Sequence, residues 1–238
     1  MVTKKVKRKE LLKSPDELVT LTSRFIDFVQ IHERQVLYVG ITVCLIAVLY
    51  LGWTWYMSHL NRMGQQAYNR AYYVLAENMD DGAAISDDTL KKAYRLFEKV
   101  IKDYGLSKAG KLALPEAAYV AFQQKRYDVS LKYYKEFLDQ ATADMKKSGL
   151  SSLTTLSIAS CYEANGEFKK AIDTLKPLVA LLGTPFRDLA MLDLERVYRL
   201  NKQPLQAKHI LEQFVADYSS SPFFREAKSR LLKYGSKN

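Results

Sequence analysis

The chain has little of what enzymes and disulfide-stabilised domains depend on. Only two cysteines and three histidines occur among 238 residues. Cys44 falls in an apolar run and Cys161 far along the chain, where it is expected to be a small buried apolar residue, so a disulfide framework is not expected. The sequence has no Gly-rich phosphate loop, no nucleophile elbow and no Cys/His set with metal-ligand spacing. We therefore predict no enzyme activity, no catalytic or metal-binding residues, no cofactor and no small-molecule substrate.

Glycine and proline are also sparse, at ten and six residues. No stretch alternates between apolar and polar residues for long enough to predict a strand. The net charge is +10, but the second part of the chain has no dense Lys/Arg block, which argues against a nucleic-acid partner. Leu, Ala, Lys, Glu and Tyr dominate instead, and together these features predict an all-α protein.

One long apolar run is present, because residues 36–57, VLYVGITVCLIAVLYLGWTWYM, contain no charged side chain. As a helix this run would extend roughly 33 Å, against about 30 Å for the hydrocarbon core of a bilayer. Its outer end has the aromatic residues expected at a membrane–water interface: Tyr50, Trp53, Trp55 and Tyr56. The run predicts a single transmembrane helix. A cleaved signal peptide fits less well, because the run is too long and lies too far from the N-terminus, and a buried core helix is the remaining alternative.

Basic residues flank the run unequally. Residues 1–35 contain eight Lys or Arg, whereas the twenty residues after Met57 contain two. By the positive-inside rule, residues 1–35 are predicted to be cytoplasmic and residues 58–238 to lie across the membrane. In a bacterium this places the protein in the inner membrane, crossed once, with residues 58–238 in the periplasm.

The predicted cytoplasmic arm, residues 1–35, combines a basic cluster with an amphipathic helix. The helix is expected to start at Ser14-Pro15, where a capping side chain precedes a proline suited to the first helical position. Behind this start, apolar residues recur at three- and four-residue steps and form one stripe: Leu18, Leu21, Phe25, Phe28 and Val29. A stripe of this kind beside a span lies in the lipid interface or docks a partner protein, and both interpretations stay open.

Residues 58–238 contain an internal repeat. The segments 117–138, 158–179 and 194–215 align, each with a helix, a short polar turn and a second helix. A small residue, which lets two antiparallel helices approach closely, opens each second helix: Ser130, Ala171 and Ala207. Ala93, 37 residues before Ser130, indicates an atypical first unit, and residues 221–234 are expected to cap the stack. Stacked hairpins bury a continuous core, which predicts a helical solenoid.

The repeat spacing resembles the tetratricopeptide repeat, most closely in the middle unit. There the signature positions are occupied by Ile158, Ala159, Tyr162, Gly166, Phe168, Ala171 and Leu175. The other units depart from the pattern, since Lys125 stands where glycine is usual and Glu195 where a small residue is usual.

The first helices of such hairpins line a concave groove in which peptides bind. By the register of the family, seven residues are candidates to face this groove: Tyr119, Phe122, Gln123, Ser160, Glu163, Arg196 and Arg199. For Tyr119 and Phe122, a place in the core is an equally open interpretation.

The order of basic arm, single span and degenerate repeats resembles the YfgM-type ancillary subunits of the bacterial SecY translocon. The junction GWTWYMSHLNRMGQQAYNRAYYVL (52–75) contains the residues of the resemblance: Gly52, Trp53, His59, Ala67, Tyr68 and Ala71. The resemblance implies a protein-binding role, with translocon subunits, a membrane-anchored periplasmic chaperone and nascent secreted chains as partners. A competing interpretation is an envelope-assembly scaffold for outer-membrane, cell-wall or secretion machinery, because the segment 210–231 resembles repeats of such scaffolds.

Overall fold

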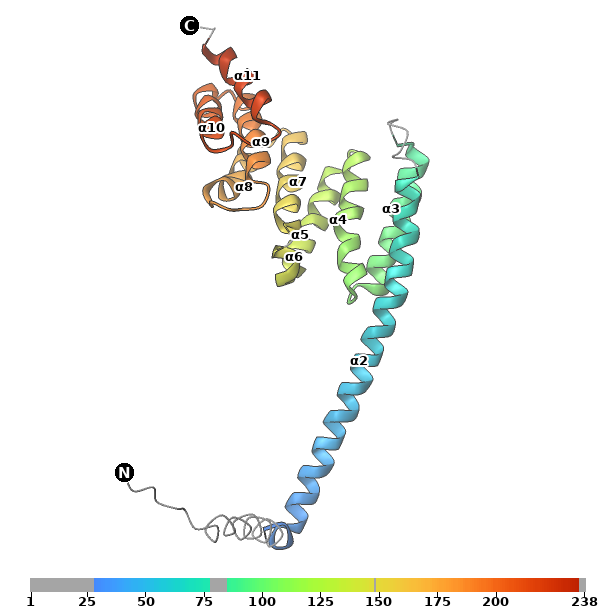
Figure 1. Ribbon diagram of the computed structural model, residues 1–238. Coiled ribbons are helices and arrows are strands. Elements are labelled where there is room, and N and C mark those ends of the chain that lie inside the picture. The colour runs from blue at the N-terminus through green and yellow to red at the C-terminus, as the bar shows by residue number, and fades with distance from the viewer. Residues whose placement is uncertain (1–27, 78–84, 148, 236–238) are drawn as a thin grey trace, which may run out of the picture. The chain divides into compact units, whose positions relative to one another are not determined.

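The computed structural model describes residues 28–77, 85–147 and 149–235, and every regular element in these ranges is helical (Figure 1). The helices are α2 (Glu33–Ala76), α3 (Asp87–Tyr104), α4 (Lys108–Gln123), α5 (Tyr127–Gln140), α6 (Ala143–Lys147), α7 (Leu150–Ala164), α8 (Phe168–Ala180), α9 (Arg187–Leu200), α10 (Pro204–Asp217) and α11 (Phe224–Gly235). The chain divides into two compact units, one up to Ser58 and one from His59 onward. The prediction of an all-α protein is confirmed for the described part of the chain.

In the first unit, α2 covers the whole apolar run 36–57. Its apolar side chains, from Leu37 to Tyr56, are exposed, including the aromatic residues of the outer end. The rings of Trp53 and Tyr56 lie 6.2 Å apart, centre to centre. By length and composition, α2 is therefore a helix able to cross a membrane, as the sequence predicted.

The amphipathic stripe of the arm falls largely outside the described residues. This applies to Leu18, Leu21 and Phe25. Phe28 is exposed, and its ring stacks on the ring of His32 at 4.6 Å between centroids. Val29 is partly buried beside it. The choice between lipid and a partner protein for this stripe stays a prediction.

In the second unit the helices pack in the order of the chain. From α3 to α5 each helix packs against the next, α5 packs against α7, and from α7 to α11 the succession continues (Figure 1). The three aligned segments fold as the pairs α4/α5, α7/α8 and α9/α10, with the predicted turns between the two helices of each pair. Because each helix meets only its near neighbours, this is the quasi-one-dimensional arrangement of a solenoid.

The small residues predicted at the helix crossings are fully buried: Ala93, Ser130, Ala171 and Ala207. Ser130 is the polar member of this group, and its hydroxyl donates to the carbonyl oxygen of Ala118 on α4 at 2.8 Å. Ala93 packs in one cluster with Ala71 and Leu75 of α2. The atypical first unit is thus formed by residues 59–76 of α2 together with α3.

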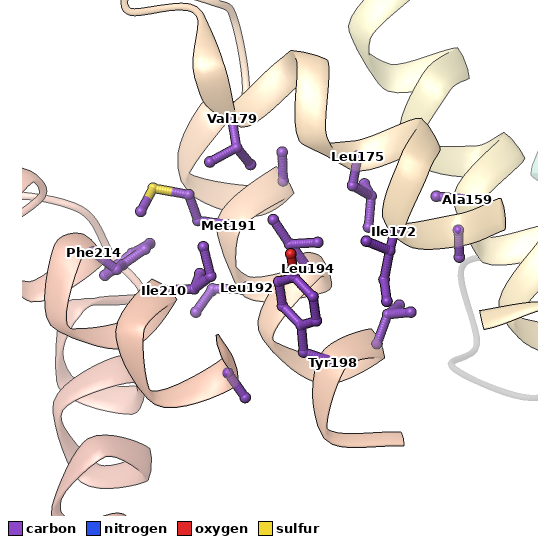
Figure 2. Packing of buried hydrophobic residues seen from close by; sticks show 14 of the residues in the cluster. Ala159, Ile172, Leu175, Val179, Met191, Leu192, Leu194, Tyr198, Ile210 and Phe214 are labelled. Atoms are coloured by element: carbon purple, nitrogen blue, oxygen red, sulfur yellow. The ribbon is translucent and has the colours of Figure 1, made fainter. Parts of the chain in front are cut away.

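The largest core cluster of the described residues joins helices α7 to α10 and includes Ala227 of the last helix (Figure 2). Leu175 of α8, Met191 of α9 and Phe214 of α10 are fully buried in it. Burying a side chain of this size contributes about 1.5–3 kcal/mol. Because these side chains come from α8, α9 and α10, their contacts hold two neighbouring hairpins together directly.

Helix α11 closes the stack, as predicted for the end of the chain. Ala227 is fully buried, and Leu231 and Tyr234 pack against the α7–α10 cluster. The helix also reaches Glu195, the charged residue at the position where the repeat usually has a small one. Glu195 exposes only 1% of its surface and accepts hydrogen bonds from Arg230 at 2.8 Å and from Tyr234 at 3.3 Å. The glutamate that departs from the repeat pattern therefore binds the capping helix α11 through its carboxylate.

Each turn inside a hairpin has one residue with a left-handed backbone conformation. Lys125, Gly166 and Lys202 each have a positive φ, at 60°, 76° and 57°. Glycine adopts this left-handed region freely, whereas another residue loses roughly 1–2 kcal/mol there. The left-handed backbone at this point favours glycine, but two of the three turns have a lysine there.

We expect the substitutions Lys125→Gly and Lys202→Gly each to stabilise the protein by about 0.5–1 kcal/mol, the relief of strain less the extra entropy of an unfolded glycine. Together they should raise Tm by about 2–8 °C. Circular dichroism of the full chain in detergent micelles during heating measures this. Lys132→Gly, at an exposed position inside α5, is the control and should lower Tm, because glycine destabilises a helix interior by about 1 kcal/mol. A fall in Tm at Lys125→Gly would contradict the argument.

Candidate functional site

Polar side chains join the first helices of neighbouring hairpins at two places in the second unit, between α2 and α4 and between α7 and α9. The surface formed by residues 59–76 of α2 and by α4, α7 and α9 is called the first-helix face below. The hydroxyl of Tyr68 on α2 donates to Glu116 of α4 at 3.1 Å. At the far end, Arg196 of α9 binds Glu163 of α7. Polar side chains therefore bridge the helices at both ends of this face.

At the α2–α4 end, the tyrosine that binds a half-buried acid contacts two further aromatic rings. The ring of Tyr68 stacks on Tyr72 at 6.2 Å and meets Phe97 edge-on at 5.8 Å. Burial raises the pKa of the Glu116 carboxyl, against the hydrogen bond from Tyr68, which lowers it. Burial likewise raises the pKa of Tyr68, so its hydroxyl stays a donor. Tyr72 itself is exposed. This end of the face therefore has an exposed aromatic ring, and the Glu116 carboxyl group nearby already accepts a hydrogen bond from Tyr68.

At the α7–α9 end, one arginine holds two carboxylates. Arg196 donates to Glu163 through Nε and Nη2, each at 2.9 Å, in a bidentate arrangement. Its Nη1 lies 2.8 Å from Asp193, one turn earlier on α9. The hydrogen bond to Glu163 raises the pKa of Arg196, against burial. Burial raises the pKa of Asp193, against the attraction of Arg196. The three side chains together carry one net negative charge in a half-buried position.

The seven predicted groove residues occupy different environments. Glu163 and Arg196 are joined in the pair just described, which the sequence had placed on separate helices. Ser160 donates its hydroxyl to the carbonyl oxygen of Leu156 at 3.1 Å. Arg199 is half exposed and donates to Glu195 at 3.3 Å. Gln123 is exposed at the end of α4.

Tyr119 and Phe122 are partly buried, and both pack against core clusters. The Phe122 ring lies 5.3 Å from the ring of Tyr127 on the next helix. Their contacts agree with a packing role, and both side chains also remain partly exposed on the first-helix face. Whether they contact a partner stays a prediction.

Sequence reasoning did not name Tyr72, Glu116 and Asp193 as residues of this face, and it named Tyr68 only for the resemblance at the junction 52–75. Helical spacing could have indicated Glu116 and Asp193. Each lies three residues before a predicted groove residue, Tyr119 or Arg196, and so on the same side of its helix. In the described ranges, no three His, Cys, Asp or Glu side chains converge in a way that could hold a metal ion.

Paired antiparallel helices stacked in chain order, with bridged first helices, define a helical-repeat protein of the solenoid class. The tetratricopeptide repeat-like domain family matches residues 33–180. The chain belongs to this family. Repeats of this kind typically form a non-enzymatic scaffold for protein–protein interaction, and the protein is accordingly a protein–protein interaction module.

Two solved structures have the same fold. One is of nearly identical TPR-like repeats from Podosopora anserina, described as a putative kinesin light chain; it is 18% identical, covers 76% of this chain and 90% of its own, and has a TM-score of 0.57. The other is a point variant of the same repeats, 17% identical over 75% of this chain and 89% of its own, also with a TM-score of 0.57. At this identity the likeness concerns the fold alone. No curated protein matches the chain.

Proposed function

We propose that the chain is a membrane-anchored interaction module that binds partner proteins on its first-helix face and assists the Sec translocon and periplasmic chaperones with secreted proteins. The observation on which this proposal rests is the first-helix face itself, in a member of the tetratricopeptide repeat-like domain family. Translocon subunits, a membrane-anchored periplasmic chaperone and nascent secreted chains are the proposed partners, on the strength of the resemblance at the junction 52–75.

The two ends of the first-helix face suit two kinds of contact. The exposed ring of Tyr72, beside Tyr68, offers a large apolar area at one end. At the other end the Glu163–Arg196 pair offers acceptors and donors in a fixed orientation. A partner segment anchored by an apolar side chain at the first and aligned by hydrogen bonds at the second would combine affinity with specificity.

Membrane anchoring by α2 is supported by the exposed apolar side chains of residues 37–56 and by the aromatic residues at the outer end. The excess of basic residues before the span supports a cytoplasmic N-terminus and a periplasmic second unit in the bacterial inner membrane. A helix that exposes so much apolar surface has no stable place in water, and a bilayer provides the missing apolar surroundings.

Site-specific photo-crosslinking in intact membranes tests the proposal. A photo-reactive residue at Gln123 or Arg199 would report on the first-helix face without removing a buried side chain, because both are exposed. Arg230 and Tyr234 still bind Glu195 when Arg199 is replaced. Lys132, exposed on the second helix of the same hairpin as Gln123, serves as the matched control. We expect crosslinks to translocon subunits, a chaperone or secreted chains from the first two positions and not from the control.

Other crosslinking patterns would overturn this function. Crosslinks only to cell-wall or outer-membrane machinery would assign the protein to the alternative, an envelope-assembly scaffold. Crosslinks from Phe28 or Val29, with none from Gln123 and Arg199, would show that the N-terminal arm binds the partner. Equal yields from Lys132 and Gln123 would mean that the first-helix face has no special role.

A further inference from the structure

A hollow of about 430 Å³ lies between α3 and the turn that joins α4 to α5. It is lined by Asp87, Lys91, Tyr94, Arg95, Gln124 and Arg126. Lys91 and Arg95 are one turn apart on α3, while Arg126 comes from the turn, about thirty residues later in the chain. None of these residues is among those proposed for the first-helix face, although Gln124 directly follows Gln123 of that face.

The hollow carries an excess of positive charge. Three of its six lining residues are cationic and only Asp87 is acidic. Within the described ranges, neither Arg95 nor Arg126 forms an ion pair with a carboxylate. Lys91 lies 3.7 Å from Asp88, but both side chains are well exposed, so this pair holds the lysine weakly. Two guanidinium groups that pair with no carboxylate of the described residues therefore face the same space.

The position of Arg126 is set before any ligand arrives. Its guanidinium lies over the ring of Tyr94, 4.5 Å from the centroid. It also donates to the Tyr94 hydroxyl at 3.5 Å and to Gln124 at 3.2 Å. Tyr94 is 7% exposed, so the ring that supports the arginine is part of the core. A side chain held in this way loses little freedom on binding, and stacking over an aromatic ring is a favourable placement for a guanidinium.

The positive charge continues along α3. Lys99 and Lys102 follow Arg95 at steps of four and three residues, so the four cations form one stripe about 16 Å long. A second hollow of about 620 Å³ beside it is lined by Glu98, Lys99, Ile101, Lys102, Asp103 and Tyr133. The acids interrupt the stripe, although Glu98 already accepts a hydrogen bond from Tyr133 at 3.1 Å. Separate cations interspersed with acids suit discrete carboxylates better than the continuous charge of a nucleic acid.

We propose that the hollow between α3 and the α4–α5 turn binds an acidic peptide segment of a partner protein, with one carboxylate held jointly by Arg95 and Arg126. Guanidinium groups bind carboxylates through paired, charge-assisted hydrogen bonds. Further acidic side chains of the same segment would lie along Lys99 and Lys102. An extended peptide advances about 3.3 Å per residue, so about five residues span the stripe.

Fluorescence anisotropy with a dye-labelled hexaglutamate peptide tests this, using the full chain in neutral detergent micelles. We expect saturable binding that weakens as salt is raised. Arg95→Gln and Arg126→Gln should each reduce the affinity about tenfold, the usual result of losing one charge-assisted contact. Lys169→Gln removes one positive charge at an exposed position on α8 and should change the affinity less than about twofold, since surface charges are screened over about 10 Å.

Three results would overturn the proposal. An equal loss at Lys169→Gln and Arg95→Gln would mean that the net charge of the protein attracts the peptide without a site. No loss at Arg95→Gln and Arg126→Gln, with unchanged helicity, would place the peptide elsewhere. Failure of hexaglutamate to bind, with binding to phosphatidylglycerol vesicles that Arg95→Gln and Arg126→Gln abolish, would assign the hollow to lipid headgroups. None of these outcomes bears on crosslinks from Arg199 on α9, which contributes no residue to the hollow, so the proposed function is tested separately.

Discussion

Replacing Gly110 with alanine is expected to destabilise the protein severely, although alanine is the better helix former. Gly110 lies in the first turn of α4. A Cβ atom at this position would lie 2.1 Å from the carbonyl oxygen of Tyr104 and 2.7 Å from the Cα of Gly105. Both are backbone atoms, so no rotamer change can relieve the clash. We expect a loss of about 3 kcal/mol or more, which outweighs the gain of about 1 kcal/mol in helix propensity.

The close approach at Gly110 follows from how the chain turns between α3 and α4. Ser107 caps α4 by accepting from the N–H of Gly110 at 2.9 Å, and its hydroxyl donates to the carbonyl oxygen of Tyr104 at 2.7 Å. This buried serine ties the end of one helix to the start of the next. A side chain at Gly110 would have to push the two helices apart and break both bonds.

The decrease in stability can be followed by circular dichroism during heating of the full chain in detergent micelles. For Gly110→Ala we expect Tm to fall by about 6–12 °C. Lys108→Ala, two residues earlier at an exposed position, is the control and should leave Tm within about 1 °C, since surface substitutions change little. A Tm for Gly110→Ala equal to that of the control would mean that α3 and α4 are further apart than the structure shows.

Arg230→Ala should release the capping helix α11. Glu195 is almost fully buried, and Arg230 is its closest partner at 2.8 Å, with Arg199 and Tyr234 at 3.3 Å. Removing one partner from a buried ion pair leaves a charge without compensation, at a cost of about 3–5 kcal/mol. We expect the lower end of this range, because Arg199 and Tyr234 remain. Once this contact is gone, α11 should separate from α9 and α10 more often than in the parent protein.

Limited trypsin digestion and thermal unfolding measure this effect together. Arg230→Ala should speed cleavage within α11 and lower Tm by about 6 °C or more. Arg225→Ala, an exposed arginine on the same helix, is the matched control and should behave as the parent. The double variant Glu195→Ala, Arg230→Ala should recover much of the loss, because no buried charge remains. If the double variant is as unstable as Arg230→Ala, packing rather than charge holds the helix.

Local signals in the sequence were sufficient for the helices and their pairing. The uncharged run 36–57 has one stable secondary structure in a membrane and forms part of α2. Ser130, Ala171 and Ala207 marked the helix crossings because close approach requires a small side chain whatever surrounds it. The turns could also be placed, because a short polar segment interrupts the helical periodicity within a few residues. The sequence did not show that α2 continues without a break from the apolar run into the first hairpin, because nothing between residues 58 and 76 distinguishes a new helix from a longer one.

By itself, the sequence therefore determined an apolar helix, a series of helical hairpins and a capping segment, because these depend on the spacing of neighbours along the chain. The tertiary structure alone decided which distant charges meet. Arg196 joins Glu163 across 33 residues, Arg230 reaches the buried Glu195 across 35, and Arg126 comes to face Lys91 and Arg95. An ion pair or a basic hollow forms only when two helices are rotated about their axes so that the right side chains face each other, and packing sets this rotation. A shift of one residue turns a helix by about 100° and would separate the same side chains.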